Sequence, residues 1–170
     1  MDTEPRIYVA SLSDYNAGNL HGVWINCNQD SENIRNEIEL MLEDSKVKGA
    51  EEWAIHDYEN FGNIKLSEYE SIETVSEVAV LIIKHGKAYT AFADYRGELK
   101  NATEESFEET YCGTYRSELE FATEIFDKLY PREEREHEYI DYESFCTDRF
   151  CGDYFSLTAP SHSVYIFRSN

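Results

Sequence analysis

The chain has 170 residues, of which 35 are Asp or Glu and 15 are Lys or Arg, so its formal net charge is −20. Its hydrophobic share of 41% is large enough for a packed core, which excludes a disordered acidic tail. The charge excludes binding to nucleic acid or to an anionic membrane by simple attraction, and it favours a partner rich in Lys and Arg.

The first part of the chain has the pattern of a small sheet with one helix. Three segments rich in β-branched and aromatic residues predict strands at 6–12, 20–25 and 53–58. The first two are joined by a turn at 14–19 that contains Asn and Gly. Apolar residues at helical spacing from Ile34 to Leu42 predict a helix before the third strand.

The middle part has the pattern of helices. Ser67 and Glu70 have the spacing of a capping box. In this motif the Ser hydroxyl accepts a hydrogen bond from the Glu amide, and the Glu carboxylate accepts one from the Ser amide. Gly86 predicts the end of this helix, and a second short helix is expected at 88–96. The first helix should bury an apolar stripe made of Ile72, Val75, Ala79 and Ile82.

The last part mixes helices and strands. Helices are expected at 104–112 and 115–130, separated by Gly113, and a third is expected at 138–150. Two short strands, 154–157 and 164–167, follow. The whole pattern predicts an α+β fold: an elongated chain of three small domains, with small antiparallel sheets at both ends and a helical middle. The expected domains are residues 1–61, 62–102 and 103–170.

Several classes of protein are excluded by local sequence. No apolar run is long enough to span a bilayer and no signal peptide begins the sequence, so we expect a cytoplasmic protein. The cysteines form neither a CxxC pair nor a regular framework, so we expect free thiols rather than disulfides or a zinc site. The four cysteines are Cys27, Cys112, Cys146 and Cys151.

Acidic residues gather in two blocks. Residues 1–60 hold 13 acidic and 4 basic residues, and residues 101–145 hold 14 acidic and 4 basic residues. Between them, residues 61–100 hold 6 acidic and 5 basic residues, and residues 146–170 hold 2 of each. Two acidic blocks therefore flank a nearly neutral helical spacer.

The amount and spacing of this charge match duplex DNA. DNA carries one negative charge per roughly 1.7 Å of axis, so 20 charges facing one way would match about 34 Å, or roughly ten base pairs. Residues four apart in a helix are separated by about 6 Å, close to the roughly 7 Å between every second phosphate of one strand. The pairs with this spacing are Glu104 with Glu108, Glu105 with Glu109, and Glu120 with Glu124.

Several strings in the chain resemble the ArdA family of antirestriction proteins. The most specific are Trp-Ala-Ile-His-Asp-Tyr-Glu at 53–59 and Tyr-Ile-Asp-Tyr-Glu at 139–143. Further matching stretches occur in the family's order, at 6–10, 15–16, 20–25, 51–52, 66–69 and 152–155. The resemblance therefore covers nearly the whole chain.

The resemblance implies a function that the residues alone do not give. It implies a homodimeric mimic of bent DNA that occupies the DNA-binding channel of type I restriction–modification enzymes and is typically encoded on mobile elements. It also implies a protein that is not an enzyme and needs no cofactor. One departure concerns the family's Ala-Arg-Asp string, where this chain has Cys146-Thr147-Asp148 and is one residue shorter before Gly152. The resemblance therefore carries no expectation for the dimer contacts of that Arg.

Together these observations predict two surfaces. The near-neutral residues 146–170 should form the homodimer contact through Phe155 and Val164, since two acidic faces repel each other. The second block should supply the DNA-mimic surface. Its expected residues are Glu104, Glu105, Glu108, Glu109, Glu118, Glu120, Glu124, Asp127, Glu138, Asp141 and Glu143.

Other functions fit the sequence less well. The main alternative is an acidic interaction module that binds another basic DNA-binding protein, and a solvated or halophilic surface is the simplest explanation of the charge. A hydrolase is not indicated because no carboxylate pair stands out. His56 lacks a nucleophile motif and is expected to be buried, as are Trp24 and Trp53. No calcium loop, phosphate-binding loop or dinucleotide motif occurs, so we expect no metal or cofactor, no direct binding of nucleic acid and no membrane contact.

Overall fold

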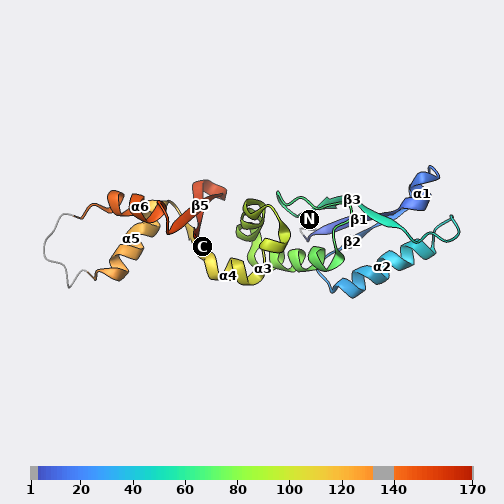
Figure 1. Ribbon diagram of the computed structural model, residues 1–170, viewed down its shortest axis with the longest axis horizontal. Helices are drawn as coiled ribbons and strands as arrows, with labels where there is room; N and C mark the ends of the chain where they lie inside the picture. Colours follow the sequence, from blue (N-terminus) through green and yellow to red (C-terminus); the bar gives the residue numbers. More distant parts are fainter. Residues whose placement is uncertain (1–3, 132–139, 170) are drawn as a thin grey trace. The chain divides into compact units, whose positions relative to one another are not determined.

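The computed structural model describes residues 4–131 and 140–169. The chain forms two compact units, one up to Ala102 and one from Thr103 onward. Each unit contains one three-stranded antiparallel sheet. Figure 1 follows the chain from the N-terminus in blue to the C-terminus in red. The α+β fold is thus confirmed, with a sheet at each end of the chain and helices between them. The layout of three domains, with its break between residues 61 and 62, stays a prediction.

The first sheet has the strand order β2-β1-β3. It is built from β1 (Arg6–Ser11), β2 (Gly22–Asn26) and β3 (Trp53–Glu59), and the turn after β1 contains the short helix α1 (Leu12–Asn16). Helix α2 (Ser31–Glu43) covers one face of this sheet. Side chains at helical spacing on α2 meet alternate residues of the strands, which explains why this face is the core. The buried residues include Ile7, Val9, Ile25, Ile34, Ile38 and Met41.

A glycine lets the other face of the sheet pack closely. Gly22 lies on β2 against the ring of Tyr8, and a Cβ placed there would approach the Tyr8 ring to 2.8 Å and the Val9 carbonyl oxygen to 2.5 Å. The Tyr8 ring in turn lies 5.5 Å from the ring of Trp24. The strand expected at 20–25 begins at Gly22, because its pairing with β1 starts at Ala10 and Gly22.

Helix α3 (Ile72–Arg96) begins later than expected. Ser71 is its N-cap, because the Ser71 hydroxyl accepts a hydrogen bond from the Thr74 amide at 3.1 Å. The capping box predicted at Ser67 and Glu70 is therefore wrong, and these residues form a turn in which the Glu70 amide bonds to the Ser67 carbonyl. Three of the four predicted stripe residues are buried, and Ile82 is half-buried.

Gly86 interrupts α3 as predicted. Its φ of 62° and ψ of −143° lie outside the helical region, so two helices meet there at a kink. Only glycine adopts this conformation without steric cost. The second helix then ends at Arg96, before Gly97, as the sequence indicated.

The second unit has the strand order β4-β6-β5. A short 3-10 turn, η1 (Leu99–Asn101), closes the first unit, and another, η3 (Pro160–His162), joins the last two strands. The helices of the second unit are α4 (Glu104–Thr110), α5 (Glu118–Leu129) and α6 (Tyr142–Phe150). Its strands are β4 (Tyr111–Tyr115), β5 (Tyr154–Ala159) and β6 (Ser163–Arg168).

Strand β4 corrects the sequence prediction, which placed helices at 104–112 and 115–130. Helix α4 ends at Thr110 and α5 begins at Glu118, so the segment between them is free to pair with β6. The register shifts between Tyr111 and Gly113, which makes Cys112 the extra residue of a β-bulge, and Gly113 has a φ of 123°. The glycine that suggested a helix break instead belongs to a bulged strand.

Aromatic rings fill both faces of this second sheet. On one face Phe107, Tyr111 and Phe155 surround Phe167, at centroid distances from 5.3 to 6.0 Å. On the other face Phe121 of α5 contacts Tyr115 and Tyr154, each at about 5 Å. Each large buried ring contributes about 1.5–3 kcal/mol. A strongly charged unit therefore still has a substantial core.

Two predictions about the chain's chemistry can be compared with the structure. All four cysteines are free, as expected. None of the helices in residues 4–131 and 140–169 combines the length and the hydropathy that a bilayer-spanning helix requires.

Candidate protein-binding surface

Helix α4 presents four exposed glutamates. Its N-cap is Thr103, whose hydroxyl accepts a hydrogen bond from the Ser106 amide at 3.2 Å. Phe107 and Thr110 are buried beneath the helix, so the remaining positions face solvent. The negative charges of Glu104 and Glu105 stabilise the helix because they lie near the positive N-terminal end of its dipole. Those of Glu108 and Glu109 lie near the negative C-terminal end and do not. The exposed residues are Glu104, Glu105, Glu108 and Glu109.

The acidic residues of α5 also have structural roles. Ser117 caps the helix, and the Glu120 carboxylate accepts a hydrogen bond from the Arg116 backbone amide at 2.7 Å. Glu118 accepts one from the Ser156 hydroxyl of β5 at 2.7 Å, which ties the helix to the sheet. Glu124 forms an ion pair with Lys128 at 2.5 Å. These carboxylates are therefore partly committed to contacts within the unit.

Some of the acidic residues around α6 also form contacts within the unit. Asp141 caps the helix by accepting a hydrogen bond from the Ser144 amide at 2.9 Å, and half-buried Asp127 accepts one from the Tyr142 hydroxyl at 3.2 Å. Glu143 is exposed. Glu138, also predicted for this surface, lies outside the described residues.

The pKa values of neighbouring groups reflect this charge. Hydrogen bonding to Glu124 raises the pKa of Lys128, which therefore stays protonated near neutral pH. Burial raises the pKa of the Cys112 thiol and that of the Tyr115 hydroxyl, so both stay neutral. The negative charge of the second unit thus comes from its carboxylates.

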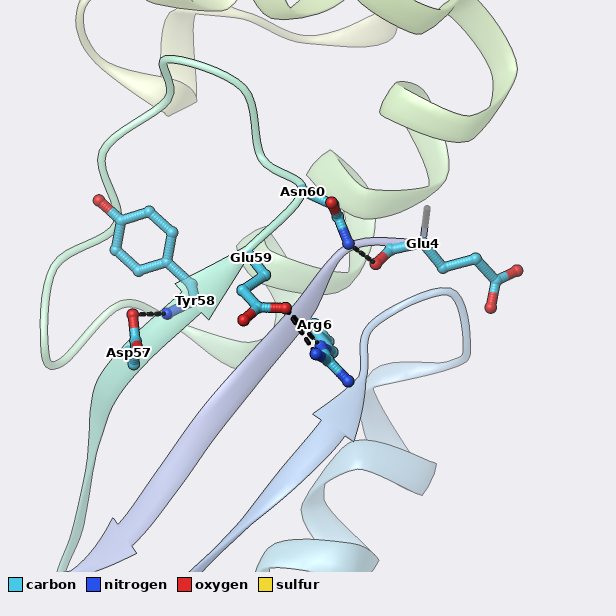
Figure 2. Close-up of polar contacts among 6 residues, drawn as sticks. All are labelled: Glu4, Arg6, Asp57, Tyr58, Glu59 and Asn60. Atoms are coloured by element: carbon cyan, nitrogen blue, oxygen red, sulfur yellow. Dashed lines mark hydrogen bonds and ion pairs between the residues drawn. The ribbon is translucent and has the colours of Figure 1, made fainter. Parts of the chain in front are cut away.

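The first unit contributes acidic residues that the sequence prediction left out. Two of its arginines are neutralised within the unit, because Arg6 pairs with Glu59 at 2.6 Å and Arg35 pairs with Glu73 at 2.5 Å. Figure 2 shows the Arg6 side chain of β1 meeting Glu59 on the neighbouring strand β3. The net charge of residues 1–60 could have indicated that the first unit also has an acidic surface. Its exposed acids include Glu32, Glu39, Glu43, Asp44, Glu51, Glu52 and Asp57.

The two predicted dimer residues lie on opposite faces of the second sheet. Phe155 pairs with Phe167, and their rings stack at 5.4 Å. Val164 pairs with Thr158 and Tyr115, three residues away from Phe167 along β6. Because side chains alternate along a strand, this odd separation places Val164 on the other face. Strand β6 is also central, so only β5 and β4 offer sheet edges.

Three residues expected to be buried are not. Trp24 is 36% exposed and Trp53 is half-buried, while His56 is exposed and contacts the edge of the Tyr15 ring at 5.1 Å. His56 is the extra residue where β3 bulges against β1, between the pairs of Tyr8 with Asp57 and Val9 with Ile55. The bulge turns its side chain outward, which strand alternation alone could not predict.

One hollow in the second unit could suggest catalysis. It measures about 550 Å³ and is bordered by Glu108, Glu109, Glu124, Lys128 and Arg168. Its three carboxylate residues are all exposed. Glycoside hydrolysis needs one carboxyl group whose pKa is raised by a sheltered site, so this hollow does not favour a hydrolase.

The carboxylate surface can bind cationic side chains. An ionised carboxylate accepts two parallel hydrogen bonds from an Arg guanidinium, as a phosphate does. Each exposed pair contributes little, about 0–1 kcal/mol, so strong binding requires many pairs at once. This chemistry suits a basic protein rather than a small ligand.

Comparison with known families gives one match. The family model described as Antirestriction protein (ArdA) matches residues 7–163. Comparison with curated proteins gives no match. The matched range includes every α-helix described above and the strands β2 to β5, but it contains only the first residue of β6.

Proposed function

Because the chain belongs to the ArdA family of antirestriction proteins, an inhibitor family, we propose that it blocks type I restriction–modification enzymes by occupying their DNA-binding channel. The carrying observation is the set of four exposed glutamates on α4, held outward by buried Phe107 and Thr110. The exposed acids of α2 and of the segment before β3 extend the same chemistry to the first unit.

The proposed mechanism is ion exchange. A DNA-binding channel lined by Lys and Arg releases anions when the acidic surface enters, as it does when phosphates enter. The carboxylates that also cap helices or pair within the unit, such as Glu120 and Glu124, add charge without being free to adapt.

Competition tests this function directly. The protein should displace a DNA duplex from a purified type I methyltransferase core, and log affinity should fall steeply with log salt between about 50 and 300 mM. An affinity that stays flat over this range would contradict charge mimicry. Failure to displace the duplex, combined with tight binding to a nucleoid protein or a repressor, would favour the alternative of a general acidic module.

We also propose a homodimer that forms through the edge of β5. The Asp153 carbonyl accepts a hydrogen bond from the Ser169 amide. The odd-numbered residues of β5 therefore direct their backbone N–H and C=O groups toward β6, and the even-numbered residues direct theirs outward. Tyr154, Ser156 and Thr158 thus direct their backbone groups toward the free edge. Phe155 would lie at the contact, and Val164 would lie one strand behind it.

A proline tests the edge contact without disturbing the internal ladder. Thr158 is exposed and its amide faces outward, so Thr158→Pro should remove a donor from the contact and leave the pairing with β6 intact. Light scattering should then show dissociation at concentrations where Thr158→Val stays dimeric. A dimeric Thr158→Pro variant with an unchanged circular dichroism spectrum would exclude this contact.

A further inference from the structure

The edge of β2 in the first unit is unusually open to pairing. Proteins protect exposed strand edges with Lys, Pro or bulges, but β2 has the sequence Gly-Val-Trp-Ile-Asn. The strand lies at the end of its sheet, next to β1 alone. An uncharged strand at a sheet edge, in a chain of net charge −20, is therefore a feature that charge mimicry does not explain.

The backbone groups available at this edge can be identified. The Ser11 amide bonds to the His21 carbonyl and the Cys27 amide bonds to the Pro5 carbonyl, so the odd-numbered residues of β2 face β1. Gly22, Trp24 and Asn26 then direct their backbone groups outward. The Asn26 carbonyl accepts a bond from Gln29, which leaves Gly22 and Trp24 as the pairing positions in the described chain.

A groove runs beside this edge, on the side covered by α2. It has a volume of about 380 Å³ and lies between the start of β2 and the last turns of α2. The His21 ring nitrogen lies 2.7 Å from the Met41 carbonyl oxygen, which fixes one wall. The groove residues are His21, Gly22, Val23, Glu37, Leu40, Met41 and Asp44.

The lining of the groove indicates what would occupy it. Leu40 is 64% exposed and lies with Val23 as an apolar surface, while Glu37 and Asp44 supply two carboxylates. No Lys or Arg borders the groove among the described residues. A strand paired with Gly22 and Trp24 would place every second side chain over this lining.

We propose that β2 and this groove bind an extended basic segment of a partner protein, which adds to the sheet as a fourth strand. Its main chain would pair with Gly22 and Trp24, an apolar side chain would cover Leu40, and a Lys or Arg would reach Asp44. Such strand addition reads a polypeptide main chain, which DNA does not have. This inference rests on the proposed function in one respect, which is that both expect a partner rich in Lys and Arg.

A peptide of defined pattern tests the site. The probe is a short labelled peptide that repeats Lys-Lys-Val-Val, so that along either face of the strand every second residue is alternately Lys and Val. Its control is the same peptide N-methylated at each central residue, which keeps the charge and removes the central main-chain donors. The full-length protein should bind the first at least about fivefold more tightly, and the Trp24 amide should become protected from hydrogen exchange.

Two charge reversals locate the site. Asp44→Lys changes a groove residue at the C-cap of α2, whereas Glu39→Lys reverses a charge on α2 itself, outside the groove. The first should weaken peptide binding about fivefold or more and the second less than about twofold.

Four results would overturn the proposal. Equal affinity for the two peptides, or equal effects of the two reversals, would show that only general acidic attraction acts. An absence of binding by the unmethylated peptide would exclude the site. Protection of the Trp24 amide that grows with protein concentration without peptide would assign the edge to a second copy of this chain. The DNA competition assay involves neither peptide, so its outcome is separate.

Discussion

Single residues in this protein are constrained most strongly where the backbone comes close to a side chain or where a carboxylate is buried. Gly22 and Asp14 are the clearest cases, and both lie in the first unit. Neither belongs to the acidic surface, so changes there should alter stability without changing the charge of that surface.

Gly22→Ala should destabilise the first unit by about 1–3 kcal/mol, because its new methyl group would overlap the Tyr8 ring and the Val9 carbonyl. Gly152→Ala is the matched control, since no atom lies within 4 Å of its added Cβ. Urea denaturation followed by circular dichroism measures both changes. Equal stability of the two variants would mean that Tyr8 moves aside without cost.

Asp14 should make stability depend on acid. Its side chain is buried, and a hydrogen bond from the Ser45 hydroxyl is the main cause that holds its pKa below the usual value. A carboxyl group with a lowered pKa in the folded state stabilises the protein above its unfolded pKa, and this stability is lost as the pH falls through the folded value.

Ser45→Ala should therefore lower the melting temperature more at neutral pH than in acid, and the difference should shrink as the pH falls through the lowered pKa of Asp14. Thermal melts at neutral and acidic pH measure the difference. Ser13→Ala, on helix α1, serves as a control for loss of a hydroxyl nearby. A loss that is larger at the lower pH would contradict the assigned role of Asp14.

At the scale of elements, the sequence predicts the regular parts and misses the places where a strand bulges or a cap shifts. The periodic apolar residues of α2 and the alternation in β1 gave those elements directly. Glu70 follows Ser67 at the capping-box spacing, which predicts a cap there, whereas the observed cap, Ser71, acts through its hydroxyl. Strand β4 was missed because it joins its sheet through long-range pairing with β6, which short-range patterns do not contain.

The acidic surface of the second unit could likewise be predicted only where local spacing decides which side chains are exposed. Residues of α4 are exposed because Phe107 and Thr110 set the buried face, and this spacing is readable in the sequence. The bond between Glu118 and Ser156 depends on a tertiary contact. Asp141 caps α6 through a local bond from the Ser144 amide, whereas the helix expected at 138–150 placed this residue inside the helix. The outward side chains of Trp24 and His56 likewise depend on the sheet that surrounds them.

Helix α4 should act as a group. Replacing Glu108 alone by Gln should change inhibition by less than about threefold, because single exposed pairs contribute little. Replacing all four glutamates of α4 should weaken inhibition by more than about tenfold, since their contacts add. The measurement is displacement of DNA from the methyltransferase core.

The matched control removes four charges elsewhere. It replaces exposed acids of the near-neutral segment by their amides, at Glu68, Glu77, Asp94 and Glu98. If this variant loses as much inhibition as the α4 variant, net charge rather than its position determines binding. A tenfold loss from Glu108→Gln alone would reveal one dominant contact instead.

At the scale of the whole molecule, the net charge of −20 acts against folding. Ion pairs offset part of this charge, among them the pairs that Arg6, Arg35 and Lys128 form with neighbouring carboxylates. Repulsion among the remaining charges is screened by salt, with a Debye length of about 10 Å at 0.1 M.

The melting temperature should therefore rise when chloride increases from about 20 to about 300 mM. Differential scanning calorimetry of the full chain measures this shift at neutral pH. Sucrose at equal osmolality is a control, because it stabilises proteins without screening charge. A lower melting temperature in salt would mean that the ion pairs outweigh the repulsion.

The distribution of indole rings gives the protein a built-in optical label. Both of its tryptophans, on β2 and β3, belong to the first unit, whereas the second unit has tyrosine and phenylalanine as its aromatic residues. Emission excited at the red edge of the absorption band thus reports on one unit by itself. Trp24, partly open to solvent beneath the Arg6 guanidinium, should change its emission whenever something covers the adjoining edge.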